Sequence, residues 1–306
     1  MILILGVTAS GKGRLAFDLA EFIGAEIISI DSMKVYRRMD IGTAKPPKEA
    51  RQRIKYHLID VVEPSDSFSV GAFMDTASDA IRQINSRKGK IVAVGGTALY
   101  IKSLLYGLFD GAGTDERIRN RLRARAEAEG LVELHCELKK IDPDAAERIN
   151  PNDAKRIIRA LEAYQLTGKP ISSFQKQWRQ RQMQHDWKII GLRREKADAS
   201  SRINKRVKKM ISAGLVDEVK SLLNEEKPLS KQARCAIGYA EIIEHLSGKM
   251  SLEEAIESIK INTRRFAKGQ RTWFKTFQNV HWLDIAEDET PEQILDRTKI
   301  LLDNIS

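Results

Sequence analysis

The chain has 306 residues, of which 42% are hydrophobic and 31% charged, and its formal net charge is +10. This composition is typical of a globular protein and excludes a disordered chain, while no run approaches the ~18 consecutive apolar residues that a membrane span needs. The two cysteines, Cys136 and Cys235, lie far apart, so neither a disulfide scaffold nor a zinc site is predicted. Because an apolar run leads directly into a glycine-rich loop, we expect no signal peptide and a cytoplasmic protein.

The N-terminal third alternates short apolar runs with helical patterns, which is typical of a parallel α/β sheet. The predicted strands cover 2–5, 26–30, 57–61 and 91–94. The predicted helices cover 14–23, 70–85 and 99–105. In such a fold the carboxyl ends of the strands meet at one edge, where α/β sheets bind their ligands.

A glycine-rich loop of the form G-x-x-x-x-G-K follows the first strand and precedes a helix, the context in which a P-loop is credible. The residues predicted to bind phosphate are Gly6, Thr8, Ala9, Ser10, Gly11, Lys12 and Gly13. Backbone N–H groups of the loop would face phosphate oxygens, the lysine would add a point charge, and the helix N-terminus would add its dipole.

Gly13 stands where a standard P-loop has the Ser or Thr that holds Mg²⁺. The missing hydroxyl removes one direct metal ligand, although a water molecule could take its place. The strand over 91–94 ends in Gly95-Gly96-Thr97 and offers no Walker-B aspartate. Both features argue against conventional ATP hydrolysis, while the anion-binding loop is kept.

Two polar side chains follow neighbouring strands at the same predicted edge. Asp31 directly follows the second strand, where a carboxylate can bind a metal, cap a helix or act as a general base. Thr97 could point its hydroxyl at the same crevice or cap the next helix. The residues alone leave these alternatives open.

Later segments are predicted to be mostly helical. We expect an all-helical insertion over 113–185 within an α/β core formed by 1–112 and 186–306. A strand over 187–192 returns to the sheet, and the rest is predicted as helices over 201–213, 215–223, 236–246 and 251–277. The last of these begins with a capping box at Ser251 and Glu254.

Charge is uneven in the C-terminal third. Residues 200–275 hold 16 Lys and Arg against 9 Asp and Glu, whereas residues 276–306 hold 2 against 7. A local basic surplus of this kind favours a face that binds a polyanionic partner. The alternative is a basic surface that is only solvated.

Taken together, the motifs resemble those of the bacterial tRNA dimethylallyltransferase family. The matching segments are Gly6–Lys12, Asp31–Met33, Met39–Pro46, His57–Asp60, Gly95–Thr97, Asn150–Arg156, Thr167–Pro170, Arg202–Val207, Ala236–Tyr239, Thr263–Arg264, Lys268, Gln270 and Thr272–Phe274. They occur in the family's order and span nearly the whole chain, so the set is far more specific than any single motif.

This resemblance implies a P-loop NTPase-like enzyme that transfers the dimethylallyl group of dimethylallyl diphosphate to N6 of the adenosine 3′-adjacent to the tRNA anticodon, releasing diphosphate. The P-loop would hold the diphosphate, with Mg²⁺ as cofactor. Asp31 would accept a proton from the amine or orient it, Thr97 would hydrogen-bond nearby, and Arg202 would neutralise leaving-group charge together with Lys12.

The partner implied by the resemblance is the anticodon stem-loop of tRNA, bound by a monomer. The residues expected to contact the RNA are Asp31, Ser32, Met33, Lys34, Arg119, Lys155, Arg156, Arg159 and Gln270. For the arginines of the insertion, surface ion pairs are the alternative. Trp273 and Phe274 could stack on bases, but at their helical spacing packing in the core is the more common role.

The chain departs from the family's pattern at four positions. Gly13 replaces Thr, Lys34 replaces Gln, Arg38 replaces Gly, and Gly269 replaces Arg. The first bears on metal ligation and the second on base recognition. Rival hypotheses are a P-loop kinase and an RNA-binding homologue without turnover. A prenyltransferase for free adenylate would not need the insertion or the basic segment over 200–275.

Overall fold

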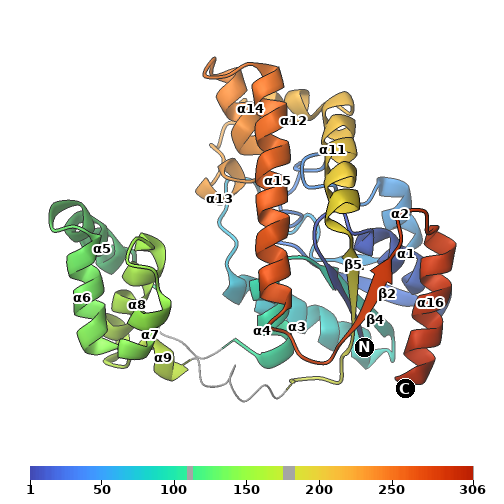
Figure 1. Cartoon of the computed structure of the whole chain (residues 1–306), viewed down its shortest axis with the longest axis horizontal. Helices are drawn as coiled ribbons and strands as arrows, with labels where there is room; N and C mark the ends of the chain where they lie inside the picture. Colours follow the sequence, from blue (N-terminus) through green and yellow to red (C-terminus); the bar gives the residue numbers. More distant parts are fainter. Residues whose placement is uncertain (109–112, 175–182, 306) are drawn as a thin grey trace. The chain divides into compact units, whose positions relative to one another are not determined.

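The computed structural model describes residues 1–108, 113–174 and 183–305. The chain divides into two compact units. The larger unit contains Met1–Leu105 and His185–Ser306, and the smaller contains Tyr106–Gln184 (Figure 1). Among the described residues, no helix combines the length and apolar character of a membrane span, and both cysteines are free and exposed.

The larger unit is built on a six-stranded parallel sheet with the strand order β3-β2-β4-β1-β5-β6. Its strands are β1 (Ile2–Gly6), β2 (Ala25–Ile30), β3 (Tyr56–His57), β4 (Lys90–Gly95), β5 (Lys188–Arg194) and β6 (Val280–Ile285). The central strands are almost continuously buried, because helices cover both faces of the sheet. The predicted α/β class with a parallel sheet is confirmed.

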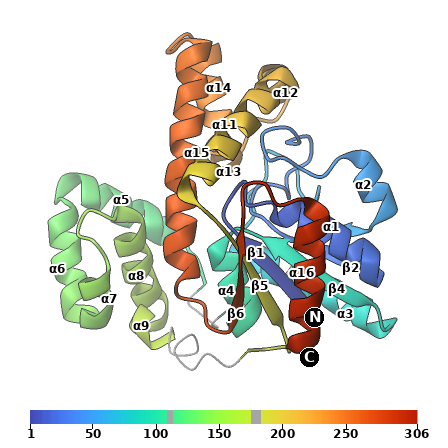
Figure 2. The same ribbon diagram turned by 45° about the vertical axis from the view of Figure 1, so that its right-hand side comes forward.

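Helices pack on both faces of the sheet (Figures 1 and 2). On one face lie α1 (Lys12–Ile23) and α16 (Pro291–Asn304), which share a core cluster with the strands. On the other face lie α3 (Val70–Ser86) and α4 (Ala98–Tyr106), joined by stacking of Phe73 on Tyr100 with ring centroids 4.3 Å apart.

A group of helices after β5 stands beyond the carboxyl edge of the sheet (Figure 1). Its members are α11 (Lys196–Ser212), α12 (Leu215–Leu223), α13 (Lys231–Arg234), α14 (Tyr239–Leu246) and α15 (Leu252–Phe274). The longest, α15, begins with the predicted capping box: Ser251 Oγ accepts from the Glu254 N–H at 3.2 Å, and Glu254 Oε2 accepts from the Ser251 N–H at 2.7 Å. These helices face the strand ends at which the candidate site residues lie.

The strand predicted over 57–61 was wrong beyond its first residue. The chain leaves the sheet after His57, because Leu58 and Asp60 adopt φ values of 61° and 56°, which an extended strand does not permit. The turn directs Asp60 toward Lys45 and Arg51, each at 2.5 Å. The segment after β2, which contains α2 (Lys48–Arg53), is therefore held by a partly buried ion cluster centred on Lys45.

The prediction of helices alone after residue 192 was also wrong. The segment Val280–Ile285 forms β6, which pairs with β5, and α16 then begins at a capping box formed by Thr290 and Gln293. Trp282 of β6 packs against Gly191 of β5. A Cβ on Gly191 would lie 2.5 Å from the Trp282 indole ring, so only glycine leaves room for the tryptophan. The acidic end of the chain thus completes the sheet.

Described secondary structure in the smaller unit is entirely helical. Its helices are α5 (Glu116–Ala128), α6 (Leu131–Ile141), α7 (Pro143–Arg148), α8 (Ala154–Thr167) and α9 (Ile171–Phe174). Their apolar faces meet in a separate core that includes Leu122, Leu134, Leu138, Ile157 and Leu161. This unit therefore has its own hydrophobic core, as a domain requires.

Candidate active site

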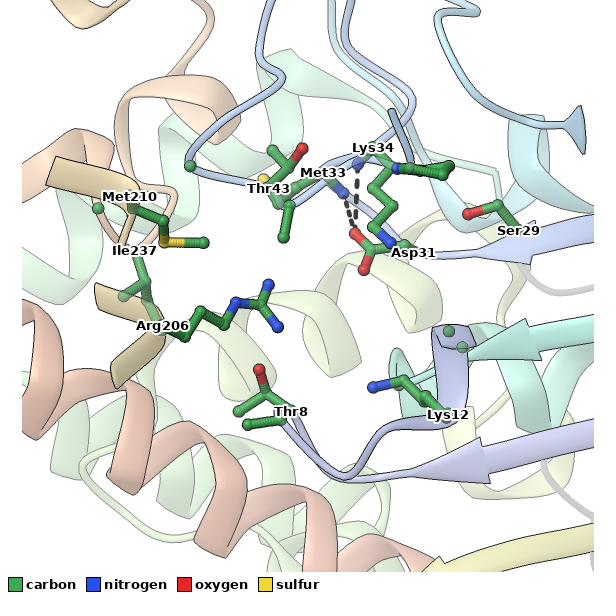
Figure 3. A pocket seen from close by; sticks show the side chains of 18 of the residues that line it. Thr8, Lys12, Ser29, Asp31, Met33, Lys34, Thr43, Arg206, Met210 and Ile237 are labelled. Atoms are coloured by element: carbon green, nitrogen blue, oxygen red, sulfur yellow. Dashed lines mark hydrogen bonds between the residues drawn. The ribbon is translucent and has the colours of Figure 1, made fainter. Parts of the chain in front are cut away.

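A cavity of about 1080 Å³ opens at the carboxyl edge of the sheet. Its lining comes from the loop after β1, the segment after β2, the end of β4, and the helices α11 and α15 (Figure 3). Predicted site residues that line it are Thr8, Ala9, Gly11, Lys12, Gly13, Asp31, Ser32, Met33, Lys34, Thr97, Arg202 and Gln270. The structure thus brings the predicted phosphate loop and the predicted catalytic residues to one cavity.

Backbone geometry explains the sequence of the phosphate loop. Ala9 and Gly11 adopt left-handed φ values of 63° and 95°. A Cβ on Gly6 would lie 2.6 Å from Ser10 Oγ, so a side chain at this position would displace the serine. Ser10 is fully buried, and its Oγ accepts from the Lys12 N–H at 3.4 Å. Gly6 and Ser10 therefore shape the loop from behind instead of lining the cavity.

Gln270 connects the phosphate loop to the end of β4. Its Oε1 accepts from the Thr8 N–H at 2.8 Å, and its Nε2 donates to the Gly96 carbonyl at 2.8 Å. The residue is 5% exposed. Both ends of the amide are engaged by main chain, so the predicted contact of Gln270 with RNA does not fit this geometry. Its place in the fold is to hold the loop.

Two arginines bind the same loop from the helical side. Arg202 Nε donates to the Ala9 carbonyl at 3.0 Å, and Arg194 Nε donates to the Ser10 carbonyl at 3.0 Å. Arg194 was missed by sequence reasoning; it ends β5 and forms an ion pair with the buried Asp198 at 2.9 Å. An arginine at the carboxyl end of a predicted strand was the available signal.

Lys12 is a partly buried cation at the floor of the cavity. Its Nζ donates to the Val7 carbonyl at 3.1 Å. Burial, reinforced by Lys34 and Arg206 and opposed by Asp31, lowers the pKa of Lys12 to about 7. An anionic ligand would restore the charged form, because an opposite charge favours the ammonium.

Asp31 follows β2, and its two carboxylate oxygens lie in different surroundings. Its Oδ1 accepts from the N–H groups of Met33 at 2.9 Å and Lys34 at 3.2 Å, which caps the turn after β2. Its Oδ2 accepts no hydrogen bond from the described residues, and the carboxylate lies at the cavity (Figure 3). One oxygen therefore fixes the side chain while the other is available to a ligand.

Thr97 joins the ends of β2 and β4. Its Oγ1 accepts from the Ser32 N–H at 3.1 Å. The hydroxyl proton is left for a ligand, since an oxygen that accepts can also donate. The hydroxyl oxygen therefore connects the ends of β2 and β4 instead of capping the following helix, which was the alternative left open by the sequence.

Lys34 and Arg206 add two more cations to the cavity wall. Figure 3 shows the Arg206 guanidinium directed into the cavity from α11. Within the described parts of the chain, neither side chain forms a hydrogen bond or ion pair, and burial lowers the pKa of both. Arg206 lies four residues after Arg202, one helical turn apart, and this spacing was the signal for it.

Apolar residues lie across the cavity from Lys12. Met210 and Ile237 lie on the side opposite Lys12 in Figure 3, and Ile203 and Phe266 also line the cavity. Among the lining residues only Asp31 and Glu49 are acidic. The cavity therefore suits a ligand with an anionic end and a small apolar end.

Glu218 of α12 fixes the loop that roofs the cavity and was also missed. Its carboxylate accepts from the N–H groups of Asp40 at 3.0 Å, Ile41 at 2.8 Å and Gly42 at 3.2 Å. It also accepts from the Tyr239 hydroxyl at 2.6 Å, and burial together with Glu218 raises the pKa of Tyr239. These contacts join segments almost 180 residues apart, which local patterns do not predict.

The side chains present do not fit a Mg²⁺ ion held directly by the protein. Gly13 supplies no hydroxyl. Across the described residues, no group of three or more His, Cys, Asp and Glu side chains could hold a metal ion. Asp31 is available through one oxygen, and Glu49 is exposed. Octahedral Mg²⁺ would need most of its ligands from elsewhere.

The arginines predicted to bind RNA in the smaller unit fall into two groups. Arg119 and Arg159 pair with the fully buried Glu162 at 3.0 Å and 2.7 Å, which matches the ion-pair alternative. Lys155 and Arg156 are exposed at the start of α8, where Arg156 forms a 3.5 Å pair with Asp153. Elsewhere, Phe274 is buried and Trp273 partly buried, so both belong to the helix packing of α15.

Comparisons with known proteins point to one family. The family model described as IPP transferase matches residues 34–277. The tRNA dimethylallyltransferase of Geobacter metallireducens is 45% identical over 284 residues, covering 93% of this chain and 92% of that protein. The tRNA dimethylallyltransferase of Acetivibrio thermocellus is 44% identical over 304 residues, covering 99% and 97%.

Solved structures give the same answer. The tRNA isopentenylpyrophosphate transferase of Bacillus halodurans aligns with a TM-score of 0.71 at 39% identity, covering 98% of this chain and 95% of that one. A eukaryotic dimethylallyltransferase acting on tRNA aligns with a TM-score of 0.81 at 28% identity, covering 99% and 79%. The resemblance to bacterial tRNA dimethylallyltransferases and the P-loop NTPase-like core are confirmed, and the chain belongs to the IPP transferase family of prenyl-group transferases.

Proposed function

We propose that this enzyme transfers a dimethylallyl group from dimethylallyl diphosphate to N6 of the adenosine on the 3′ side of a tRNA anticodon. The observation that carries the proposal is the juxtaposition of the phosphate loop with the available oxygen of Asp31 in one cavity. The opposing apolar wall, with Met210 and Ile237, suits a five-carbon prenyl chain.

In the proposed reaction the N6 lone pair forms a bond to C1 of the allylic group. The C1–O bond breaks, and its electron pair leaves with the diphosphate. The amine proton passes to Asp31 Oδ2, which is positioned because its other oxygen is held by two N–H groups. The phosphate loop, Lys12, Arg202 and Arg206 stabilise the charge that develops on the leaving group.

The cavity also supports the choice of acceptor. An allylic centre that becomes electron-deficient reacts with water, and a buried site with an apolar wall limits this competing reaction. An adenine inside an RNA loop can reach such a site only when it is drawn out of its stack. Thr97 Oγ1 has a second lone pair beside the one used by the Ser32 N–H, and it would orient the exocyclic amine by accepting one of its N–H groups.

The proposed partner is the anticodon stem-loop of tRNA. Exposed cations are the expected contacts to its phosphates, and Lys155 and Arg156 are the predicted residues of the insertion that are exposed. The monomeric state, the cytoplasmic location and the tRNA-binding role of the insertion stay predictions. The Mg²⁺ predicted from the resemblance is untested, and any ion that accompanies the donor would be held by the donor's own diphosphate and by water.

The substitution Asp31→Asn tests the proposed base while keeping an oxygen for the turn. We expect a fall in kcat of about 10²-fold or more, because the amide cannot take the proton. Incubation of unmodified tRNA with dimethylallyl diphosphate, followed by mass spectrometry of the nucleosides, measures the product. Near-full turnover by Asp31→Asn would show that the base is misassigned.

The same assay separates the rival functions. Tight ATP binding with phosphate transfer, and no reaction with the allylic diphosphate, would identify a kinase. Binding of the anticodon stem-loop without any turnover would identify an RNA-binding protein. Modification of free adenylate in preference to tRNA would point to the adenylate prenyltransferases.

A further inference from the structure

Two positions of this cavity depart from the family's pattern. The first is Gly13, where a P-loop hydroxyl holds Mg²⁺. Gly13 lines the cavity, and a Cβ built on it meets no atom within 4 Å. Nothing in the packing therefore requires glycine here, and the loss of the hydroxyl is a property of the site's chemistry.

The second position is Lys34, which brings an ammonium group to the same cavity. Figure 3 shows its side chain extending from the turn after β2 toward the side that holds Asp31 and Lys12. In the part of the chain that the structure describes, its Nζ forms no hydrogen bond or ion pair. After burial, Lys34 is the largest cause of the lowered pKa of Lys12, and it is the largest among the charged groups. The ammonium is thus close to the phosphate loop and free to take a ligand.

The balance of charge in the cavity indicates what that ligand is. Lys12, Lys34, Arg202 and Arg206 are opposed by Asp31 and by the exposed Glu49. Lys12 and Arg202 each donate to a main-chain carbonyl of the loop, whereas Lys34 and Arg206 have no partner among the described residues. Partly buried cations that are gathered in this way are stabilised when an anion binds among them. A dication entering beside Lys34 would be repelled by the ammonium and would find no hydroxyl at Gly13.

We propose that the Lys34 ammonium takes the part in diphosphate binding that a metal ion ligated by the P-loop hydroxyl has in an ordinary site, so that this enzyme binds its diphosphate without requiring a divalent cation. Lysine is a compact charge with three donors, and it binds phosphate oxygens in charge-assisted hydrogen bonds. The inference rests on the proposed function, because it takes the donor to be an allylic diphosphate. It also gives Lys34 a ligand other than the RNA base predicted from the sequence.

Calorimetry with inorganic pyrophosphate and with dimethylallyl diphosphate tests the proposal on the full chain without RNA. Each ligand is titrated in EDTA and again in Mg²⁺. We expect the unmodified enzyme to bind both in EDTA, with a Kd that Mg²⁺ changes by less than about threefold. The substitution Lys34→Gln should weaken binding in EDTA by about tenfold or more.

Two further variants make the test specific. Lys209→Gln removes the same charge from an exposed position of α11 outside the cavity, and its Kd should stay within about twofold. The double variant Gly13→Thr/Lys34→Gln restores the hydroxyl and removes the ammonium, so Mg²⁺ should tighten its binding by about tenfold or more. Circular dichroism melts establish that each variant is folded.

The outcomes separate this inference from the proposed function. Binding by the unmodified enzyme that is lost in EDTA and restored by Mg²⁺ would overturn the role of Lys34, and so would an unchanged Kd for Lys34→Gln in EDTA. Binding of pyrophosphate but not of dimethylallyl diphosphate would refute the proposed donor while the role of Lys34 in binding diphosphate would stand.

Discussion

At the scale of single residues, the lowered pKa of Lys12 predicts how the stability of the protein depends on pH. The pKa of Lys12 is about 7 in the folded chain, below the ordinary lysine value of 10.5. Between these values the unfolded chain binds more protons, so this residue makes the free energy of unfolding rise with pH, and below pH 7 the full cost of its charge is present. Lys12→Met should therefore raise the free energy of unfolding by on the order of a few kcal/mol at pH 6 and by less at pH 9.5, with a correspondingly larger rise in Tm at pH 6.

The same substitution should abolish pyrophosphate binding. Differential scanning calorimetry measures the Tm, and isothermal titration calorimetry measures the binding. Lys209→Met is the matched control, because Lys209 is exposed on α11. A lower Tm for Lys12→Met at pH 6 would show that Lys12 is not destabilising when charged.

Glu218 provides a second prediction at this scale. Glu218→Gln replaces one of the two oxygens that accept from the loop by an N–H donor, which would face the N–H groups of Asp40, Ile41 or Gly42. We expect it to lower the free energy of unfolding in urea by about 2–3 kcal/mol. Tyr239→Phe removes only one hydroxyl and should cost about 1 kcal/mol. The reverse order would mean that the carboxylate does not hold the loop.

Arg38 gains an explanation from the structure. Its φ is 61°, the left-handed region that glycine prefers, and glycine is the family's usual residue here. Arg38 tolerates this strain while its guanidinium pairs with Glu63 at 2.6 Å and with Glu225 at 2.7 Å. Exposed pairs of this kind contribute about 0–1 kcal/mol, so they offset part of the strain.

At the scale of elements, the two glycines at 269 and 42 should respond oppositely to substitution by alanine. Gly269 lies within α15, and a Cβ there meets nothing within 4 Å. Gly269→Ala should therefore raise the free energy of unfolding by about 0.5–1 kcal/mol, because alanine is the better helix former. In Gly42→Ala the Cβ would lie 2.4 Å from the Tyr239 ring, so this variant should be destabilised. Urea denaturation of both measures the contrast, and a destabilised Gly269→Ala would contradict it.

The elements also show where local patterns are sufficient. The capping box at Ser251 predicted the start of α15, since this signal lies within four residues. Strand β6 was missed, because an edge strand of six residues is stabilised by its partner β5 and by Trp282 against Gly191. Pairing with a strand about 90 residues away is not encoded in local periodicity.

At the scale of the whole molecule, the proposed RNA contacts predict a dependence on salt. The affinity for an anticodon stem-loop should fall as salt rises, and each phosphate contact that is removed should reduce the slope of log K against log[salt] by about 1. We expect this for Lys155→Ala and Arg156→Ala, measured by fluorescence anisotropy. Lys90→Ala, at the amino end of β4, should leave the slope unchanged. If all three variants kept the slope of the unmodified protein, the insertion would not belong to the RNA-binding surface.

The sequence by itself determined the class of fold and the centre of the site. The spacing from Gly6 to Lys12, and the placement of Asp31 and Thr97 directly after apolar runs, locate groups at strand ends, and parallel strands bring these ends to one edge. Only the tertiary structure decided the partners of Gln270, Arg119 and Arg159, and the roles of Arg194 and Glu218. Whether a polar side chain meets a ligand or another part of the chain depends on contacts between distant segments, and those exist only once the chain has folded.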